Sequence, residues 1–348
     1  MRIAIVNDMR FAVEGLRRIL VASPEYTLAW AAENGKEAVE KCAADIPDLI
    51  LMDLIMPVMD GVEATRRIMT QSPCPILVVT SSVDGNAAKV FEAMGAGALD
   101  AVKTPVFGKS GEVDGDAALL FKIQTIKKLT NGVKVMGSSP VIARGSSGRF
   151  VNGALVAIGS SSGGPTALAQ VLGSLPADFA ASVVIIQHVD AHFAEDMASW
   201  LNDQSALPVR TARNNEELQP ATVYIAATSD HLVISSAGRL QYTPEPRKFI
   251  YRPSVDVFFD SVAKHWRGNT TAVLLTGMGR DGALGLLNLR NMGIHTIAQD
   301  KASCAVYGMP KAAASMNAAV EILPLDEIGP AIVKRFSKKT DQRRSVAP

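Results

Sequence analysis

Short apolar runs alternate with amphipathic segments along the first third of the chain. An apolar run of four to six residues is typical of a buried strand, whereas apolar positions three and four apart are typical of a helix. Leu16, Ile19 and Leu20 lie on one such helical face. The alternation predicts five βα units and hence a parallel, doubly wound sheet. The expected strands cover residues 3–6, 28–32, 49–52, 76–79 and 98–102.

This periodicity ends after an amphipathic helix that we expect to begin at Asp116 and stop at Gly132. The following residues are rich in glycine, serine and other turn formers and offer no core positions, which predicts a flexible linker. The last residues are polar and non-periodic, as in a frayed tail. We therefore expect a first domain over residues 1–130, a linker over 131–150, a second domain over 151–340 and a disordered tail over 341–348.

Apolar runs in the second domain lead into side chains that carry chemistry. Ser161 and His188 each follow such a run closely, and Asp281 lies in the turn after a third. Parallel strands place their carboxyl ends at one edge of a sheet, so residues far apart in sequence converge there. A serine, a histidine and an aspartate at that edge predict nucleophilic hydrolysis. The three runs cover residues 154–159, 183–187 and 271–276.

Two glycine-rich turns surround these residues. Residues 159–165 read Gly-Ser-Ser-Ser-Gly-Gly-Pro, and their G-x-S-x-G spacing selects Ser161 as the exposed nucleophile. Taken alone, this pattern equally fits a phosphate-binding loop or a plain helix cap. In the second turn, residues 276–283, the Met278 amide is a candidate oxyanion donor and Asp281 can orient His188. Asp281 can also cap a helix, a role compatible with the catalytic one.

The remaining histidines are expected to have surface or packing roles. Only His188 directly follows a fully apolar strand at the active edge, which makes it the expected general base. The others are His192 in a helical turn, His231 at the start of a strand, His265 late in a helix and His295 within a strand.

The amino-acid composition excludes several classes of protein and of binding partner. The 348 residues are 48% hydrophobic and 20% charged, enough for two cores. With 35 basic and 34 acidic residues the net charge is +1, which provides no field for collecting nucleic acid or an anionic membrane. The three cysteines match neither a disulfide framework nor a zinc site. The strand-like start lacks a signal peptide, and no apolar stretch approaches about 20 residues. We expect a cytoplasmic protein without membrane insertion.

Polar residues also collect where the expected strands of the first domain end. Neighbouring carboxylates can hold Mg²⁺, and the metal together with an ammonium group would neutralise a phosphoryl group placed on one of them. The pattern predicts phospho-aspartate chemistry. The residues are Asn7 and Asp8 after the first strand, Asp53 after the third, Thr80 after the fourth and Lys103 after the fifth.

Residues 51–61, Leu-Met-Asp-Leu-Ile-Met-Pro-Val-Met-Asp-Gly, together with Thr80 and the Lys-Thr-Pro at 103–105, resemble the receiver domain of bacterial response regulators. The resemblance implies a flavodoxin-like (βα)5 fold and phosphorylation by a sensor histidine kinase. It also implies the site residues. Asp53 would accept the phosphoryl group, Asp8, Asp53 and the backbone carbonyl of Ile55 would bind Mg²⁺, Thr80 would contact the phosphoryl group, and Lys103 would pair with it.

Position 7 departs from the receiver pattern. Receivers usually carry two acidic residues after the first strand, whereas this chain has Asn7 and Asp8. Asn7 can accept a hydrogen bond from a metal-bound water, but the site loses one negative charge. We therefore expect weaker Mg²⁺ binding and altered phosphorylation kinetics.

The second domain resembles the catalytic domain of chemotaxis-type protein-glutamate methylesterases, on residues 158–165, 187–188, 275–283 and 306–310. It is expected to be a doubly wound, mostly parallel α/β domain. Where this family has Ser-Thr-Gly-Gly, the chain has Ser161-Ser-Gly-Gly, so Ser162 keeps a hydroxyl in its supporting role beside the oxyanion. Residues 5–9 and the Asp53 region are most similar to the Wsp-type surface-sensing subgroup.

The resemblance implies hydrolysis of glutamate methyl esters on a methyl-accepting chemoreceptor-like protein, with release of methanol and no metal in the hydrolytic step. It also implies that the unphosphorylated receiver covers the site. Two alternatives stay open: a glutamine deamidase that uses the same triad, and an inert binding protein gated by phosphorylation. A DNA-binding output is disfavoured because the second half has a βα pattern and no basic helix-turn-helix segment.

Overall fold

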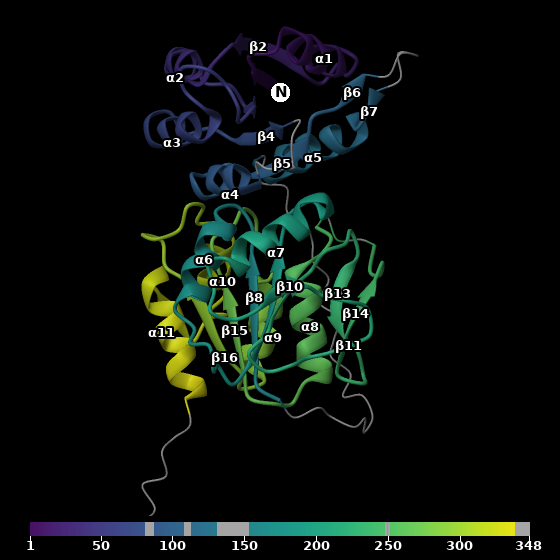
Figure 1. Ribbon diagram of the computed structural model, residues 1–348, viewed down its shortest axis with the longest axis vertical. Helices are drawn as coiled ribbons and strands as arrows, with labels where there is room; N and C mark the ends of the chain where they lie inside the picture. Colours follow the sequence, from purple (N-terminus) through teal and green to yellow (C-terminus); the bar gives the residue numbers. More distant parts are fainter. Residues whose placement is uncertain (81–86, 108–112, 131–152, 248, 250, 338–348) are drawn as a thin grey trace, which may run out of the picture.

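The computed structural model describes residues 1–80, 87–107, 113–130, 153–247, 249 and 251–337, which form two α/β domains placed one above the other (Figure 1). The predicted linker at 131–150 and the tail at 341–348 lie outside these residues, as does the expected helix stop at Gly132. The domain boundaries stay predictions. Among the described residues, no helix combines the length and the apolar character that crossing a bilayer requires.

The first domain has the predicted five-stranded sheet. Its strands are all parallel and lie in the order β2-β1-β3-β4-β5. The last strand was expected to begin at residue 98, but β5 begins at Asp100. An antiparallel pair of two-residue strands, β6 (Val106–Phe107) and β7 (Val113–Asp114), was not predicted. The sheet strands are β1 (Arg2–Val6), β2 (Thr27–Ala32), β3 (Leu49–Met52), β4 (Ile76–Thr80) and β5 (Asp100–Lys103).

Helices cover both faces of this sheet, as the doubly wound prediction requires. Side chains of α1 and α5 share a core with one face, and those of α2, α3 and α4 share a core with the other. Asn34 and Asp60 cap α2 and α3 by accepting backbone N–H groups of the first turn. The helices are α1 (Arg10–Val21), α2 (Gly35–Ala44), α3 (Gly61–Gln71), α4 (Ala87–Gly95) and α5 (Asp116–Thr130).

The second domain is built on a parallel sheet of seven strands, in the order β10-β12-β9-β8-β15-β16-β17. Its central strands β8, β9 and β15 are buried along their whole length, which explains why the sequence shows them as continuous apolar runs. The strands are β8 (Leu155–Ser160), β9 (Ser182–Gln187), β10 (Val209–Thr211), β12 (Val223–Ile225), β15 (Thr270–Leu274), β16 (His295–Gln299) and β17 (Glu321–Leu323).

A smaller antiparallel sheet lies beside the main one, in the order β11-β14-β13. It contains the predicted strand that opens at His231. Its strands are β11 (Glu216–Glu217), β13 (His231–Ile234) and β14 (Arg239–Thr243). The helices of this domain are α6 (Gly164–Gly173), the short η1 (Ala191–Phe193), α7 (Ala194–Asn202), α8 (Val255–His265), α9 (Ala283–Asn291), α10 (Met309–Ser315) and α11 (Leu325–Phe336).

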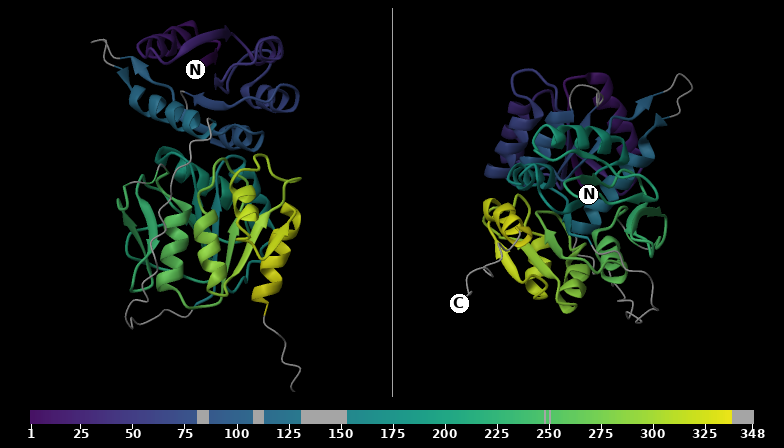
Figure 2. Two further views of the ribbon diagram at one scale, coloured as in Figure 1. Left: turned by 180° about the vertical axis from the view of Figure 1, so that it is seen from behind. Right: turned by 60° about the horizontal axis from the view of Figure 1, so that its bottom comes forward.

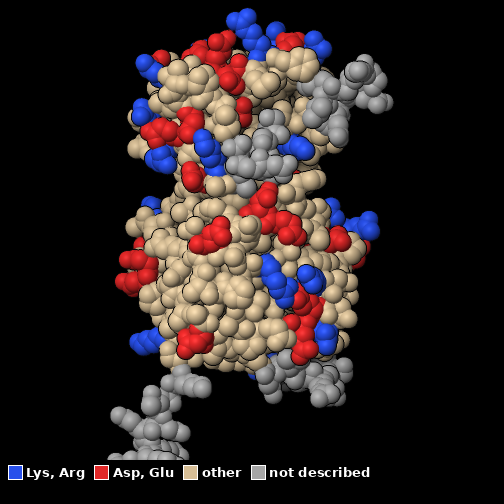
Figure 3. Space-filling model, viewed as in Figure 1, with Lys and Arg blue, Asp and Glu red and all other residues tan. Residues whose placement is uncertain are grey.

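The two domains meet through α4 of the first and helices α6 and α7 of the second. The rings of Phe91 and Trp200 lie 5.5 Å apart between centroids across this contact. Gly95, at the end of α4, lies so close to Thr166 that an added Cβ would be 2.0 Å from its hydroxyl oxygen. The left view of Figure 2 shows from behind that the first domain lies over one end of the second. Basic and acidic side chains are interspersed on the face in Figure 3, in keeping with the near-zero net charge.

Candidate active site

Three adjacent strands of the seven-stranded sheet carry the predicted triad at their carboxyl ends. Ser161 directly follows β8, His188 directly follows β9, and Asp281 lies in the loop between β15 and α9. Strand β8 pairs with β9 on one side and with β15 on the other. The chain leaves β8 toward one half of the sheet and later returns to the other half, so the three tips surround a topological switch point, the usual ligand site of such sheets.

His188 and Asp281 form a buried pair, with His188 Nε2 2.8 Å from Asp281 Oδ2. Three further groups bind the carboxylate: the Ser254 hydroxyl at 2.8 Å and the backbone N–H groups of Val255 at 2.7 Å and Asp256 at 3.1 Å. Burial opposes the ionisation of Asp281, but its hydrogen bonds and the adjacent imidazole outweigh that cost and hold the pKa of its carboxyl below the ordinary value. Asp281 is therefore a charged partner for His188.

Asp281 caps α8 and not α9, the helix that follows it in the chain. Helix α9 begins after Gly282, and the carboxylate of Asp256 accepts the N–H of Gly285 in its first turn at 2.7 Å. The carboxylate of Asp281 instead accepts the first N–H groups of α8. His231, which was expected to have a packing or surface role, supports this arrangement from strand β13. Its Nδ1 accepts the backbone N–H of Ser254 at 3.1 Å, and it is fully buried. The N-terminus of α8 thus binds the Asp281 carboxylate, and His231 of β13 binds the residue that precedes this helix.

The serine loop is fixed from both neighbouring strands. The N–H of Ser161 donates to the carbonyl of Thr276 at 3.0 Å, and Gln187 donates its side-chain amide to the carbonyl of Ser161 at 2.9 Å. Gln187 also accepts the Ser160 hydroxyl at 2.6 Å. An added Cβ on Gly164 would lie 2.0 Å from the oxygen of that amide, so glycine is needed there. Sequence reasoning missed this positioning role of Gln187, although a polar residue ending an apolar strand was a visible signal.

The structure shows no hydrogen bond between the side chains of Ser161 and His188 in this conformation. Their strands are neighbours, and the N–H of His188 donates to the carbonyl of Ser160 at 3.1 Å. Yet His188 Nδ1 is buried and has no hydrogen-bond partner among the described residues. Because Nε2 binds Asp281, Nδ1 is the nitrogen left to receive the serine proton. Catalytic hydrogen bonds of this kind commonly tighten only when substrate binds.

The expected oxyanion residues have different surroundings. The hydroxyl of Ser162 donates to the backbone carbonyl of Leu99, in the first domain, at 3.0 Å. In this conformation it binds the other domain instead of supporting an oxyanion. Met278 lies in the loop beside Ser161, since an added Cβ on Gly277 would be 2.8 Å from the Ser161 Cβ. Within the described part of the chain, no hydrogen bond uses the Met278 amide.

The other three histidines lie in the kinds of element that the sequence predicted. His192 is in the turn η1 and pairs with Asp190 at 2.8 Å, and His265 is the last residue of α8. His295 opens β16 and lies 2.9 Å from Glu321.

The first domain gathers the predicted phosphoacceptor residues at the carboxyl end of its sheet. Asp53 is 8% exposed, and its carboxylate accepts the N–H of Leu54 at 2.7 Å and the side-chain amide of Asn7 at 3.0 Å. Burial, with a smaller contribution from the charge of Asp8, raises the pKa of Asp53. Thr80 and Lys103 are register partners at the ends of β4 and β5. Asn7 contacts Asp53 directly in this structure, and its expected hydrogen bond to a metal-bound water stays a prediction.

The donor set of this pocket fits Mg²⁺. The carboxylates of Asp8 and Asp53 and the carbonyl of Ile55 are hard oxygen donors, which Mg²⁺ prefers, and one or two carboxylates are usual for this ion. Asp8 is exposed, so it is free to turn toward a metal. The pocket holds two carboxylates only, and no group of three or more histidine, cysteine or acidic side chains suited to a metal occurs in the described residues.

Together, a receiver-like (βα)5 domain and an α/β domain with serine, histidine and aspartate at its active edge define the class of response regulators that carry a hydrolase domain. Comparison with known families agrees. Residues 156–332 match the family described as CheB methylesterase, and residues 3–109 match the response regulator receiver domain. The chain therefore belongs to the CheB methylesterase family.

Two relatives align with the chain over their whole length. The chain is 55% identical to protein-glutamate methylesterase/protein-glutamine glutaminase 3 of Pseudomonas aeruginosa, over 97% of this chain and 100% of the relative. It is 52% identical to the enzyme of the same name from Mesorhizobium japonicum, over 98% and 100%. The crystal structure of the CheB methylesterase catalytic domain from Thermotoga maritima matches with a TM-score of 0.49 and 36% identity, over 53% of this chain and 99% of that one.

Proposed function

We propose that the protein is a phosphorylation-regulated protein-glutamate methylesterase that acts on a methyl-accepting chemoreceptor-like protein. The observation that carries this proposal is the buried His188–Asp281 pair at the strand tips beside Ser161. The names of the relatives, which specify a glutamate methylesterase and a glutamine glutaminase, support both the ester and the amide substrate. Similarity of residues 5–9 to the Wsp-type subgroup supports a surface-sensing pathway in the cytoplasm.

In this proposal each side chain of the site has a role. Nδ1 of His188 takes the proton of Ser161 as the hydroxyl oxygen attacks the ester carbonyl, and Asp281 stabilises the imidazolium through Nε2. The Met278 amide donates to the tetrahedral oxyanion. Collapse of this intermediate breaks the ester C–O bond, and methanol leaves with the proton from His188. A water molecule, activated by the same imidazole, then hydrolyses the acyl-enzyme to glutamate and restores Ser161.

We further propose that the receiver domain blocks this site until Asp53 is phosphorylated by a histidine kinase. Ser161 is only 5% exposed, and its neighbour Ser162 binds the receiver carbonyl of Leu99, so a protein substrate has no access. Asp8, Asp53 and the carbonyl of Ile55 would hold Mg²⁺, which supplies positive charge for phosphoryl transfer. Lys103 and Thr80, at the ends of neighbouring strands, would then contact the phosphoryl group.

The catalytic test compares the wild type with Ser161→Ala on a methylated receptor fragment. Methanol release should fall at least about a thousandfold, because loss of the nucleophile removes the covalent route. The melting temperature should stay close to that of the wild type. Release of methanol by the variant at the wild-type rate would exclude Ser161 as the nucleophile.

Two further readouts separate the alternatives. Ammonia release from a fragment that carries glutamine measures deamidation by the same site. Labelling of Ser161 by a fluorophosphonate distinguishes an active hydrolase from an inert binding protein, because only an activated serine reacts.

A further inference from the structure

A tyrosine lies flat against the catalytic histidine. The rings of Tyr251 and His188 are 4.0 Å apart between centroids and only 6° from parallel. Tyr251 belongs to the loop between β14 and α8, and a few residues later the same segment supplies Ser254 and Val255, which bind Asp281. One short segment therefore contacts both the imidazole and its carboxylate.

The hydroxyl of Tyr251 adds no hydrogen bond to the active site as the structure describes it. It is buried and has no hydrogen-bond partner among the residues that the structure describes. Burial, followed by the charges of Asp281 and of Asp100 in the receiver strand β5, raises the pKa of this phenol far above its ordinary value, so it stays neutral. The aromatic ring, rather than the hydroxyl, is thus the part of Tyr251 that serves the site.

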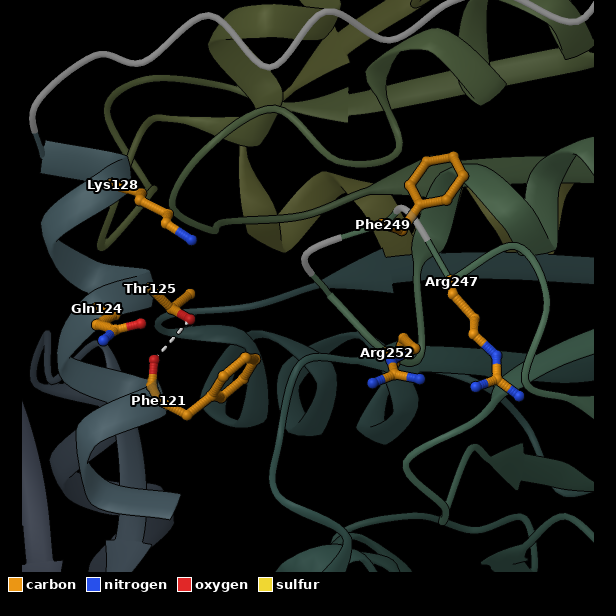
Figure 4. Close-up of a pocket in the computed structure, with 7 residues that line it drawn as sticks. All are labelled: Phe121, Gln124, Thr125, Lys128, Arg247, Phe249 and Arg252. Carbon is orange, nitrogen blue, oxygen red and sulfur yellow. Dashed lines mark hydrogen bonds between the residues drawn. The ribbon is translucent and has the colours of Figure 1, made fainter. Parts of the chain in front are cut away.

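The loop that carries Tyr251 faces the receiver domain. Figure 4 shows Arg247, Phe249 and Arg252 on one side of a pocket and side chains of α5 on the other. The α5 side is lined by Phe121, Gln124, Thr125 and Lys128. The receiver therefore borders the segment that holds the imidazole.

The imidazole needs a second restraint. Among the described residues, the His188 side chain makes one hydrogen bond, at Nε2, which fixes one edge of the ring and leaves it able to tilt about that contact. A tilt would move Nδ1 away from Ser161, and a misplacement of about 1 Å in an active site can cost 10²-fold in rate. A flat ring at 4.0 Å blocks such a tilt on one face. It also presents its π-electrons to the imidazolium that forms during catalysis.

We propose that Tyr251 is a positioning residue, whose ring sets the plane of the His188 imidazole so that Nδ1 meets the Ser161 hydroxyl. This role rests on the proposed hydrolase function. It deepens that function by adding an aromatic support outside the Ser-His-Asp set.

The test uses the full chain, activated with acetyl phosphate and Mg²⁺, and compares Tyr251→Phe with Tyr251→Leu. Phenylalanine keeps the ring and removes only the unpartnered hydroxyl, so kcat for methanol release should stay within about twofold of the wild type. Leucine removes the flat face, and kcat should fall about 10- to 100-fold. KM should change less than threefold, because positioning of the base acts on the chemical step. The rate of fluorophosphonate labelling at Ser161 should fall with kcat.

Two variants keep this test decisive. Phe121→Leu makes the same kind of change across the pocket, on the exposed face of α5, and should leave kcat unaltered. If Tyr251→Leu fails to fold, Tyr251→Met replaces it, because methionine fills irregular space without a flat ring.

Several results would overturn the proposal: an unchanged kcat without the ring, a loss confined to KM, or an equal loss in the phenylalanine variant, which would assign the role to the hydroxyl. If the wild type is labelled at Ser161 but releases no methanol, the methylesterase proposal fails. The labelling rates of the variants still decide the role of Tyr251.

Discussion

At the scale of single residues, Asn7 distinguishes the proposed phosphoacceptor site from the usual receiver pattern. Its amide nitrogen donates to Asp53, and its oxygen accepts the N–H of Met9 at 2.8 Å, so the side chain is held in one orientation. A carboxylate at this position could not donate to Asp53 and would add a negative charge. The asparagine therefore replaces a metal-attracting charge by a hydrogen bond that needs no metal.

This arrangement predicts tighter Mg²⁺ binding by Asn7→Asp. One extra charge about 4 Å from a divalent ion near a protein surface is worth enough to raise affinity roughly tenfold after solvent screening. Titration of Mg²⁺ into both proteins measures the difference, and Asn7→Ala, which removes the donor without adding charge, serves as the control. Equal affinities of the wild type and Asn7→Asp would refute this account of position 7.

At the scale of secondary-structure elements, the fully buried strands were the easiest to predict, because burial gives them a regular apolar sequence pattern. Strands β8, β9 and β15 are buried along their whole length and appear as mostly apolar runs, so their tips and the residues Ser161, His188 and Asp281 could be found. The three-residue strands β10, β12 and β17 are too short for any period to show.

Apart from the convergence of the triad at the strand tips, most contacts between elements could not be predicted from the sequence. The cap that Asp281 gives to α8 and the stacking of Tyr251 on His188 join segments 25 or more residues apart in the chain. Neither follows from local pattern, because each depends on how the loop before α8 folds over the sheet. The contact of Ser162 with the receiver depends on domain docking and was equally invisible.

The link from β13 to α8 through His231 predicts a pH-dependent stability. Burial lowers the pKa of His231, so the fold favours the neutral ring whose Nδ1 accepts the Ser254 N–H. A lowered pKa in a base means that the unfolded chain binds more protons, so this contribution is complete above the unfolded pKa of about 6.5 and is lost as pH falls below it. His231→Asn keeps an acceptor and cannot titrate.

Urea unfolding at pH 7.5 and pH 5.5 measures this difference. The wild type should lose more unfolding free energy between the two pH values than His231→Asn does. Parallel losses in the two proteins would show that His231 is not the titrating group.

At the scale of the whole molecule, the proposed closure of the hydrolase by its own receiver rests on the way the two domains dock. Helix α4 packs on α6 and α7, and α6 directly follows the nucleophile loop, so the surface that docks the receiver is continuous with the active site. The close approach of Gly95 to Thr166 makes this docking sensitive to a single methyl group. The same docking places Leu99 on Ser162. Release of the receiver would uncover the whole serine loop at once.

The most direct measurement of this account is methanol release from a methylated receptor fragment, by the full chain with and without acetyl phosphate and Mg²⁺, beside Gly95→Ala. The wild type should be slow and should accelerate at least about tenfold on phosphorylation. Gly95→Ala should be fast without it, because its Cβ would lie 2.0 Å from the Thr166 hydroxyl oxygen and would oppose docking. Adding Thr166→Ala, which removes the clashing hydroxyl, should restore repression. A methanol rate indifferent to phosphorylation and to Gly95→Ala would contradict a receiver-closed methylesterase.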